Sequence, residues 1–190
     1  MRSPSTSLWL SILIACGPSS VPSAPGEATA AISGDLTRQF LGVSSFTRSD
    51  GGEPSQPASV TVSARARGSD GEQELVFDII GTAHPVRGRY AIRPAGTMRA
   101  ADTSVTAVYM ETNSRFVAFS ADSGTFTVTH ADANRIDGTF HLVASRYCLR
   151  FADGALEGSC DPSLRQSGNA PQIALQGSVT AKRSVTKGDY

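Results

Sequence analysis

Residues 124–144 read GTFTVTHADANRIDGTFHLVA, and this stretch decides the fold class. Apolar and polar residues alternate in 124–130 and again in 135–144, and the polar bend ADAN at 131–134 joins the two runs. Alternation of this kind is typical of a strand with one buried face, and two such runs around a short polar bend indicate an antiparallel hairpin.

The predicted register of this hairpin pairs His130 with Ile136. In that register one face collects the apolar side chains of Phe126, Val128, Ile136, Phe140 and Leu142, with the two phenylalanines opposite each other. The other face collects Thr125, Thr127, Thr129, Thr139 and His141, so that His130 and His141 lie on opposite faces. The register is strongly specified, because a shift by one residue would turn half of the apolar side chains toward solvent.

The rest of the chain repeats this pattern of short alternating runs between turn-forming residues, and no long run has the period of a helix. Further strands are predicted at 29–33, 40–46, 59–67, 73–80, 88–92, 105–110, 116–121 and 172–181. About ten strands without a helix predict an all-β domain, either an antiparallel β-sandwich or a barrel-like sheet. The segments 50–57 and 161–171 are rich in turn formers and are expected to be surface loops.

The first residues of the sequence predict an export signal. Arg2 precedes a largely apolar run from Leu8 to Ala15, which is far shorter than the roughly 20 residues that span a bilayer as a helix. The sequence Leu13-Ile-Ala-Cys16 resembles the lipobox of bacterial lipoproteins. The resemblance implies that the Cys16 thiol receives diacylglycerol, that residues 1–15 are cleaved off and that the new amino terminus is acylated. An ordinary signal-peptidase site fits less well, because Leu13 is too large for its position, and the short apolar run argues against an uncleaved anchor.

Three parts are therefore predicted. Residues 1–15 are the signal peptide, 16–28 are the lipidated cysteine and a proline-rich tether too poor in large apolar groups to fold, and 29–190 form a single all-β domain. Gly17 replaces the aspartate that usually keeps such lipoproteins at the inner membrane, so the resemblance implies the outer membrane, on its periplasmic or outer surface. Two or three acyl chains make a stable anchor, at about 0.8 kcal/mol per buried methylene.

Cys148 and Cys160 are expected to form a disulfide. Between them lies Asp153-Gly154, a favoured two-residue hairpin turn, and a bulge at Gly158 brings the two cysteines opposite each other. Exported proteins pass through an oxidising compartment, and a disulfide across so short a loop contributes about 3 kcal/mol in the chain-entropy model.

The composition excludes several classes of function. The chain has 17 Lys and Arg against 17 Asp and Glu, without a basic stripe, which argues against nucleic-acid binding and against polyanionic glycans held by charge. The three histidines have no metal-ligand spacing, so neither a metal nor another cofactor is expected. Neither Gly-x-Ser-x-Gly nor Ser-x-x-Lys occurs, so no catalytic residue is assigned. Most aspartates flank glycine or lie in predicted bends, where carboxylates accept hydrogen bonds from backbone amides.

The function expected from these observations is that of a non-enzymatic, lipid-anchored envelope protein whose β domain binds a protein or glycan partner or contributes to the cell surface. The hairpin at 124–144 is similar to one in several families of small envelope lipoproteins of unknown function with a β-sandwich domain, which supports fold and compartment. Trp9 leaves with the signal, so Tyr109 or Tyr147 would have to supply any aromatic platform for a sugar.

The alternative is a lipocalin-like carrier of a small apolar ligand, suggested by the Gly-x-aromatic repeats that begin at Gly88, Gly124 and Gly138. A third candidate, an envelope hydrolase, has no recognisable motif. An apolar interior cavity favours the carrier, and a solidly packed interior favours the partner-binding domain.

Overall fold

A computed structural model describes residues 25–52, 56–68, 71–95, 97, 103–113, 116–147 and 170–184. The regular structure in these ranges is entirely β-strand. The strands are β1 Gly26–Gly34, β2 Arg38–Ser49, β3 Ser59–Gly68, β4 Gly71–Ile80, β5 Gly88–Ile92, β6 Ser104–Thr112, β7 Phe116–Ala131, β8 Arg135–Tyr147 and β9 Gln172–Arg183. The predicted all-β fold is confirmed.

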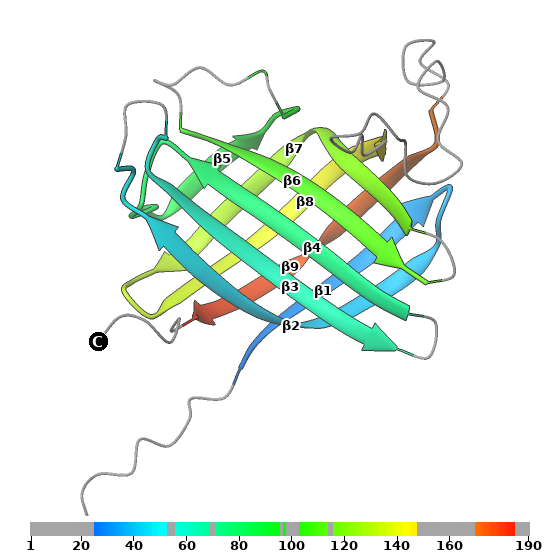
Figure 1. The fold of residues 1–190 in the computed structure, drawn as a ribbon, viewed down its shortest axis with the longest axis horizontal. Coiled ribbons are helices and arrows are strands. Elements are labelled where there is room, and N and C mark those ends of the chain that lie inside the picture. The colour runs from blue at the N-terminus through cyan, green and yellow to red at the C-terminus, as the bar shows by residue number, and fades with distance from the viewer. Residues whose placement is uncertain are drawn as a thin grey trace, which may run out of the picture.

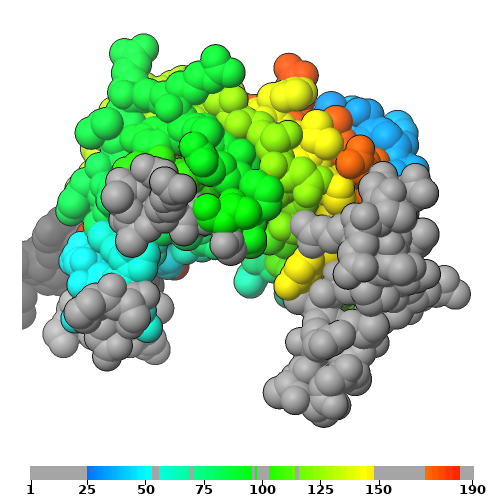
Figure 2. All heavy atoms as spheres, turned by 90° about the horizontal axis from the view of Figure 1, so that it is seen from above, coloured from blue at the N-terminus to red at the C-terminus, as the bar shows by residue number. Residues whose placement is uncertain are grey.

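The nine strands form one sheet that closes into a barrel, as Figure 1 shows. The order of neighbours is β1-β2-β3-β4-β6-β5-β7-β8-β9, and β1 pairs with β9 along most of its length. The short strand β5 completes the wall where β6 and β7 separate, since β7 pairs with β6 through 116–120 and with β5 through 124–128. Figure 2 shows blue and orange atoms, from the two ends of the described chain, side by side on one flank. The sheet is therefore closed by strands that are distant in sequence.

Each strand predicted from alternation within the described residues is present, with small changes at its ends. The runs 116–121 and 124–130 belong to one strand, β7, because a bulge at Asp122 carries the pairing with β8 across the interruption. The barrel also begins earlier than expected. Ala28 is buried in β1 opposite Val179, so the expected tether overlaps the first strand.

The β7–β8 hairpin has the predicted register over most of its length. Phe126 lies opposite Phe140, but a second bulge between Val128 and His130 pairs His130 with Asp137. The predicted pair of His130 with Ile136 is therefore wrong. The bulge also leaves His130 exposed, as His141 is, so these two histidines do not lie on opposite faces. A local pattern cannot reveal an inserted residue of this kind.

The bend after β7 is held by one carboxylate. The Asp132 carboxylate accepts hydrogen bonds from the backbone amides of Asn134, at 2.7 Å, and Arg135, at 2.8 Å, and from His130 Nε2 at 2.9 Å. The prediction that aspartates in bends bind backbone amides holds at this position. These contacts fix the bend and set the start of β8.

The core lies inside the barrel and consists of the inward side chains of all nine strands. Its largest fully buried members are Tyr109, Phe40, Phe46, Phe77, Phe126, Ile32, Leu75, Ile79, Ile136, Leu142, Ile173 and Leu175. The ring of Phe77 packs against those of Phe126 and Phe140, with centroids 4.9 Å apart in both cases. Aromatic rings from β4 on one side of the barrel and from β7 and β8 on the other therefore meet in its interior.

Inward glycines let some of these rings lie directly on the neighbouring backbone. A Cβ atom at Gly177 would stand 2.8 Å from Cζ of Phe140 and 1.9 Å from the carbonyl oxygen of Thr29. Gly138 has the same relation to the ring of Phe126, at 3.0 Å. At Gly177 the absence of a side chain therefore allows β9 to approach β1 closely while the Phe140 ring fills the space beneath it.

Candidate functional site

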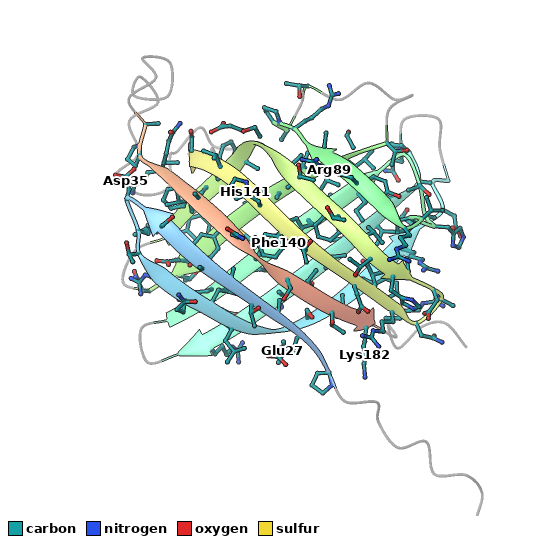
Figure 3. All side chains as sticks on the ribbon, turned by 180° about the vertical axis from the view of Figure 1, so that it is seen from behind. Glu27, Asp35, Arg89, Phe140, His141 and Lys182 are labelled. Atoms are coloured by element: carbon teal, nitrogen blue, oxygen red, sulfur yellow. The ribbon has the colours of Figure 1, made fainter. Side chains whose placement is uncertain are left out.

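A groove of about 760 Å³ crosses the outer face of the barrel over β5, β7, β8, β9 and β1. Its lining residues are Thr29, Ala31, Arg89, Thr125, Thr127, Thr139, Phe140, His141, Gln176, Gly177 and Ser178. Figure 3 views this face and labels Arg89 on β5 and His141 on β8. Most of the lining residues carry polar side chains, and they come from β1 and β9, the first and last described strands, as well as from β5, β7 and β8.

Strand pairing arranges the lining side chains in two rows across the sheet. The first, here called the hydroxyl row, runs through directly paired neighbours in the order Arg89, Thr127, Thr139, Ser178 and Thr29. The second, here called the amide row, runs in the order Thr125, His141, Gln176 and Ala31. Neighbouring strands lie about 4.8 Å apart, so the polar groups in each row repeat at about that distance.

The floor of the groove lies between the two rows. The residues that separate them point inward, and the paired Phe140 and Gly177 form the floor. Phe140 is only 3% exposed, so it contributes backbone rather than its ring. The close packing at Gly177 thus supports the core on one side of the wall and forms the groove on the other.

Two hydrogen-bond contacts order the polar groups of the groove. The hydroxyls of Thr29 and Ser178 lie 3.2 Å apart within the hydroxyl row. The Nη2 atom of Arg89 donates a hydrogen bond to the Thr125 hydroxyl at 3.1 Å, from one row to the other. The guanidinium therefore lies across the β5 end of the groove.

The groove differs in charge from the neighbouring outer surfaces. Its lining contains Arg89 and His141 and no aspartate or glutamate. On the outer face of β3 and β4, by contrast, arginines are paired with glutamates: Arg65 Nε lies 2.9 Å from Glu74 Oε1, and Arg67 Nη2 lies 3.7 Å from Glu72 Oε2. A chain with a formal net charge of zero thus has, in the groove, a cationic and hydroxyl-rich surface.

The side chains of the groove can form hydrogen bonds with a ligand, because their hydroxyl, amide, imidazole and guanidinium groups donate or accept them. His141 has no carboxylate beside it in the lining, so the groove lacks a carboxylate–histidine pair for acid–base catalysis. Across the ranges that the structure describes, no group of three or more His, Cys, Asp or Glu could hold a metal ion. What the arrangement can do is bind a polar ligand.

A second polar cluster lies inside one end of the barrel. Glu111 on β6 is 5% exposed, and its Oε1 accepts a hydrogen bond from the Tyr109 hydroxyl at 2.5 Å and lies 3.1 Å from Nε of Arg38. Burial, together with this hydrogen bond to Glu111, raises the pKa of Tyr109 far above its usual range. The three side chains link β2 to β6 at the boundary of the apolar core, which indicates a structural role.

Arg48 occupies the opposite end of the barrel. Its guanidinium lies over the ring of Phe46, 5.1 Å from the centroid, and donates a hydrogen bond to the carbonyl oxygen of Asp132. It also lies 3.4 Å from Nδ1 of His84. Arg48 therefore connects β2 to two loops and covers the end of the core.

None of the groove residues is predicted from the sequence as a site. The alternation predicts Thr125, Thr127, Thr139 and His141 on one face of the hairpin, and all four line the groove. Closure of β1 onto β9 and the pairing of β5 with β7 complete the rows, and these are long-range contacts without a local signal. Of the two tyrosines considered for a sugar platform, Tyr109 is 1% exposed, and Tyr147 is 38% exposed but does not line the groove.

The predicted lipidation site Cys16 and the predicted disulfide partners Cys148 and Cys160 lie outside the described residues, as does most of the segment 161–171. These assignments stay predictions. A search of the described part of the chain for a helix long and apolar enough to cross a membrane finds none. The chain matches no family model, no curated protein and no solved structure in three comparisons.

Proposed function

We propose that this chain is a lipid-anchored protein of the bacterial cell envelope whose β domain binds a polar ligand in the outer groove and catalyses no reaction. The observation that carries the proposal is the groove itself, in which five strands present polar side chains around Arg89. The lipobox-like sequence that ends at Cys16 supports the anchor.

Binding is favoured over catalysis by the way the groove is built. Its side chains stand on strands of a closed sheet, so hydrogen-bonding groups are held in place before a ligand arrives, which lowers the entropy lost on binding. No nucleophile in the lining is paired with an acid–base group. A rigid surface of this kind selects a ligand by its shape and by its donors and acceptors.

The groove is also favoured over the barrel interior as the binding site. Phe77 packs against Phe126 and Phe140 in the middle of the barrel, where a lipocalin-like carrier would hold its apolar ligand. A ligand there would have to displace these rings, whereas the groove is open to solvent.

Mass spectrometry of the amino terminus tests the anchor. The full chain, produced with its own signal in a Gram-negative host, should begin at a lipidated Cys16 and remain with the membranes. The Cys16→Ser variant should lack the lipid. Retention of residues 1–15, or an unmodified Cys16 in the wild-type protein, would contradict the anchor.

A bulky substitution in the groove tests the binding site. Thr139 and Thr47 are both exposed threonines on strands, but only Thr139 lines the groove. On glycan and peptide arrays, Thr139→Trp should abolish the binding that the wild-type protein shows, and Thr47→Trp should retain it. Equal thermal melting temperatures for the two variants would exclude misfolding as the cause. If Thr139→Trp bound as the wild type does, the groove would not be the site.

A further inference from the structure

We infer that the ligand of the groove is a saccharide chain that bears a carboxylate, a uronate-type oligosaccharide, with its acidic group on Arg89. The inference rests on the proposed function, because it names the ligand class of that same groove. Three observations support it: the spacing of the hydroxyl row, the lack of a carboxylate beside Arg89 among the described lining residues, and the position of the nearest described acidic side chains.

The hydroxyl row matches a chain of sugars. Thr127, Thr139, Ser178 and Thr29 present hydroxyls on four successive strands, about 4.8 Å apart. This spacing is comparable to the length of one pyranose ring in an extended oligosaccharide. The amide row, on the other side of the groove, adds Gln176 and His141, whose planar polar groups hydrogen-bond well to sugar hydroxyls.

Arg89 supplies the charge. Its guanidinium donates to Thr125, and the groove lining provides no carboxylate for it. Guanidinium groups bind carboxylates through two parallel hydrogen bonds, which makes a planar carboxylate a suitable ligand group. One permanent cation suits a singly charged carboxylate better than a doubly charged phosphate group.

Acidic side chains near the other part of the groove orient the ligand. Glu27 and Asp137 both pair with Thr180, in the row next to the hydroxyl row, and Asp137 is 2.7 Å from Nε of Arg135. Figure 3 labels Glu27 well away from Arg89 on this face. An anionic group would be repelled near Glu27, so we place the carboxylate at the β5 end and uncharged sugar over β9 and β1.

Hydrogen bonds must supply most of the affinity. No aromatic side chain in the lining is exposed, since Phe140 is buried, and a stacking platform for a pyranose ring is therefore missing from the groove. The sequence has no basic stripe, and binding through one arginine and several hydroxyls does not require one. The ligand is recognised by one carboxylate and several hydroxyls, not by bulk charge.

The test uses a hexasaccharide of neutral pyranoses that bears one terminal uronate, and the methyl ester of that uronate, which has the same sugars without the charge. Binding to ¹⁵N-labelled Cys16→Ser protein is followed by backbone amide shifts and by calorimetry. We expect the acid to shift the amides of the two rows and to bind roughly tenfold more tightly than the ester, the usual size of a charge-assisted hydrogen bond. Arg89→Gln should remove that difference, and Arg89→Lys should restore part of it.

Arg65→Gln is the matched control. Arg65 is also exposed on a strand, but it lies on the far outer face and pairs with Glu74, so its loss should leave both affinities unchanged. If acid and ester shift the same groove amides with equal affinity, the inference fails while the proposed function stands. If neither saccharide shifts the groove, the inference also fails. If ligands found on the arrays ignore Thr139→Trp as well, the proposed function fails with it.

Discussion

At the scale of single residues, the barrel is held at its ends by a few polar side chains whose partners come from distant strands. Arg38, Tyr109 and Glu111 form one such group, and Arg48 connects β2 to two loops at the other end. Their types are visible in the sequence, but their partners are not, because hydrophobic alternation says which face a residue occupies and nothing about which strand lies opposite.

Tyr109 should make the protein less stable in alkali. Burial and Glu111 raise the pKa of Tyr109, so above about pH 10 an unfolded chain ionises this phenol while the folded barrel keeps it protonated. The stability is therefore fully present below that pH and decreases as pH rises. In a pH titration, the difference in tyrosinate absorbance between the wild type and Tyr109→Phe should appear only together with the loss of the far-ultraviolet β signal. Ionisation of Tyr109 in a folded barrel would disprove this.

Asp132 should act in the opposite pH range. Hydrogen bonds from the Asn134 backbone amide, from His130 and from the Arg135 amide lower the pKa of Asp132 to about 2. Its contribution to stability is therefore present above its unfolded pKa, near 4, and is lost as pH falls through about 2. The melting temperature of the wild type should exceed that of Asp132→Asn at pH 6, and the two should converge toward pH 2. A difference that stays constant with pH would rule out this linkage.

At the scale of elements, alternation in the sequence predicts the strands well and their pairing poorly. The β7–β8 hairpin could be predicted with its phenylalanine pair because the two strands are joined by a short bend. The bulges in β7 were missed, since an inserted residue leaves the composition of a strand unchanged. The groove was missed for a related reason: its rows depend on β1 meeting β9 and on β5 meeting β7, which no local motif specifies.

Gly177 should be intolerant of a side chain. An added methyl group would stand 1.9 Å from the Thr29 carbonyl oxygen, so β9 would have to move away from β1. We expect Gly177→Ala to lower the free energy of unfolding by about 1–3 kcal/mol, the usual effect of overpacking. Gly88 is the control, because a Cβ there meets nothing within 4 Å. Chemical denaturation of both variants should show a loss for Gly177→Ala alone. Equal stabilities would mean that the two strands can separate without cost.

At the scale of the whole molecule, all nine described strands contribute side chains to one hydrophobic core. Alternation correctly predicts the inward residues of the β7–β8 hairpin, such as Phe126 and Phe140. Whether the strands form two sheets or one closed sheet depends on pairings across the full length of the chain, which alternation does not specify. The central contacts of Phe77 with Phe126 and Phe140 join β4 to β7 and β8 across the interior. Stability should therefore be a property of the complete ring.

Phe77→Ala should weaken the whole barrel at once. Removal of a buried phenylalanine ring costs about 3–5 kcal/mol, and the rings that meet Phe77 belong to two other strands. Urea unfolding followed by tyrosine fluorescence and by far-ultraviolet circular dichroism should show one transition, shifted equally for both probes. Val76→Ala, on the outer face of the same strand, should cause a much smaller loss. Separate transitions for the two probes would show that the core is not one unit.

The ring closure also has a mechanical consequence. If the chain is tethered through Cys16, a pull on the membrane anchor reaches the barrel at Gly26, where β1 is flanked on both sides by antiparallel ladders to β2 and β9. Force along β1 would load both ladders in shear, so many hydrogen bonds would have to break together rather than one after another. An open sheet with β1 at its edge would have only one such ladder. The strand that would receive the pull of such an anchor is thus held by two ladders against extension.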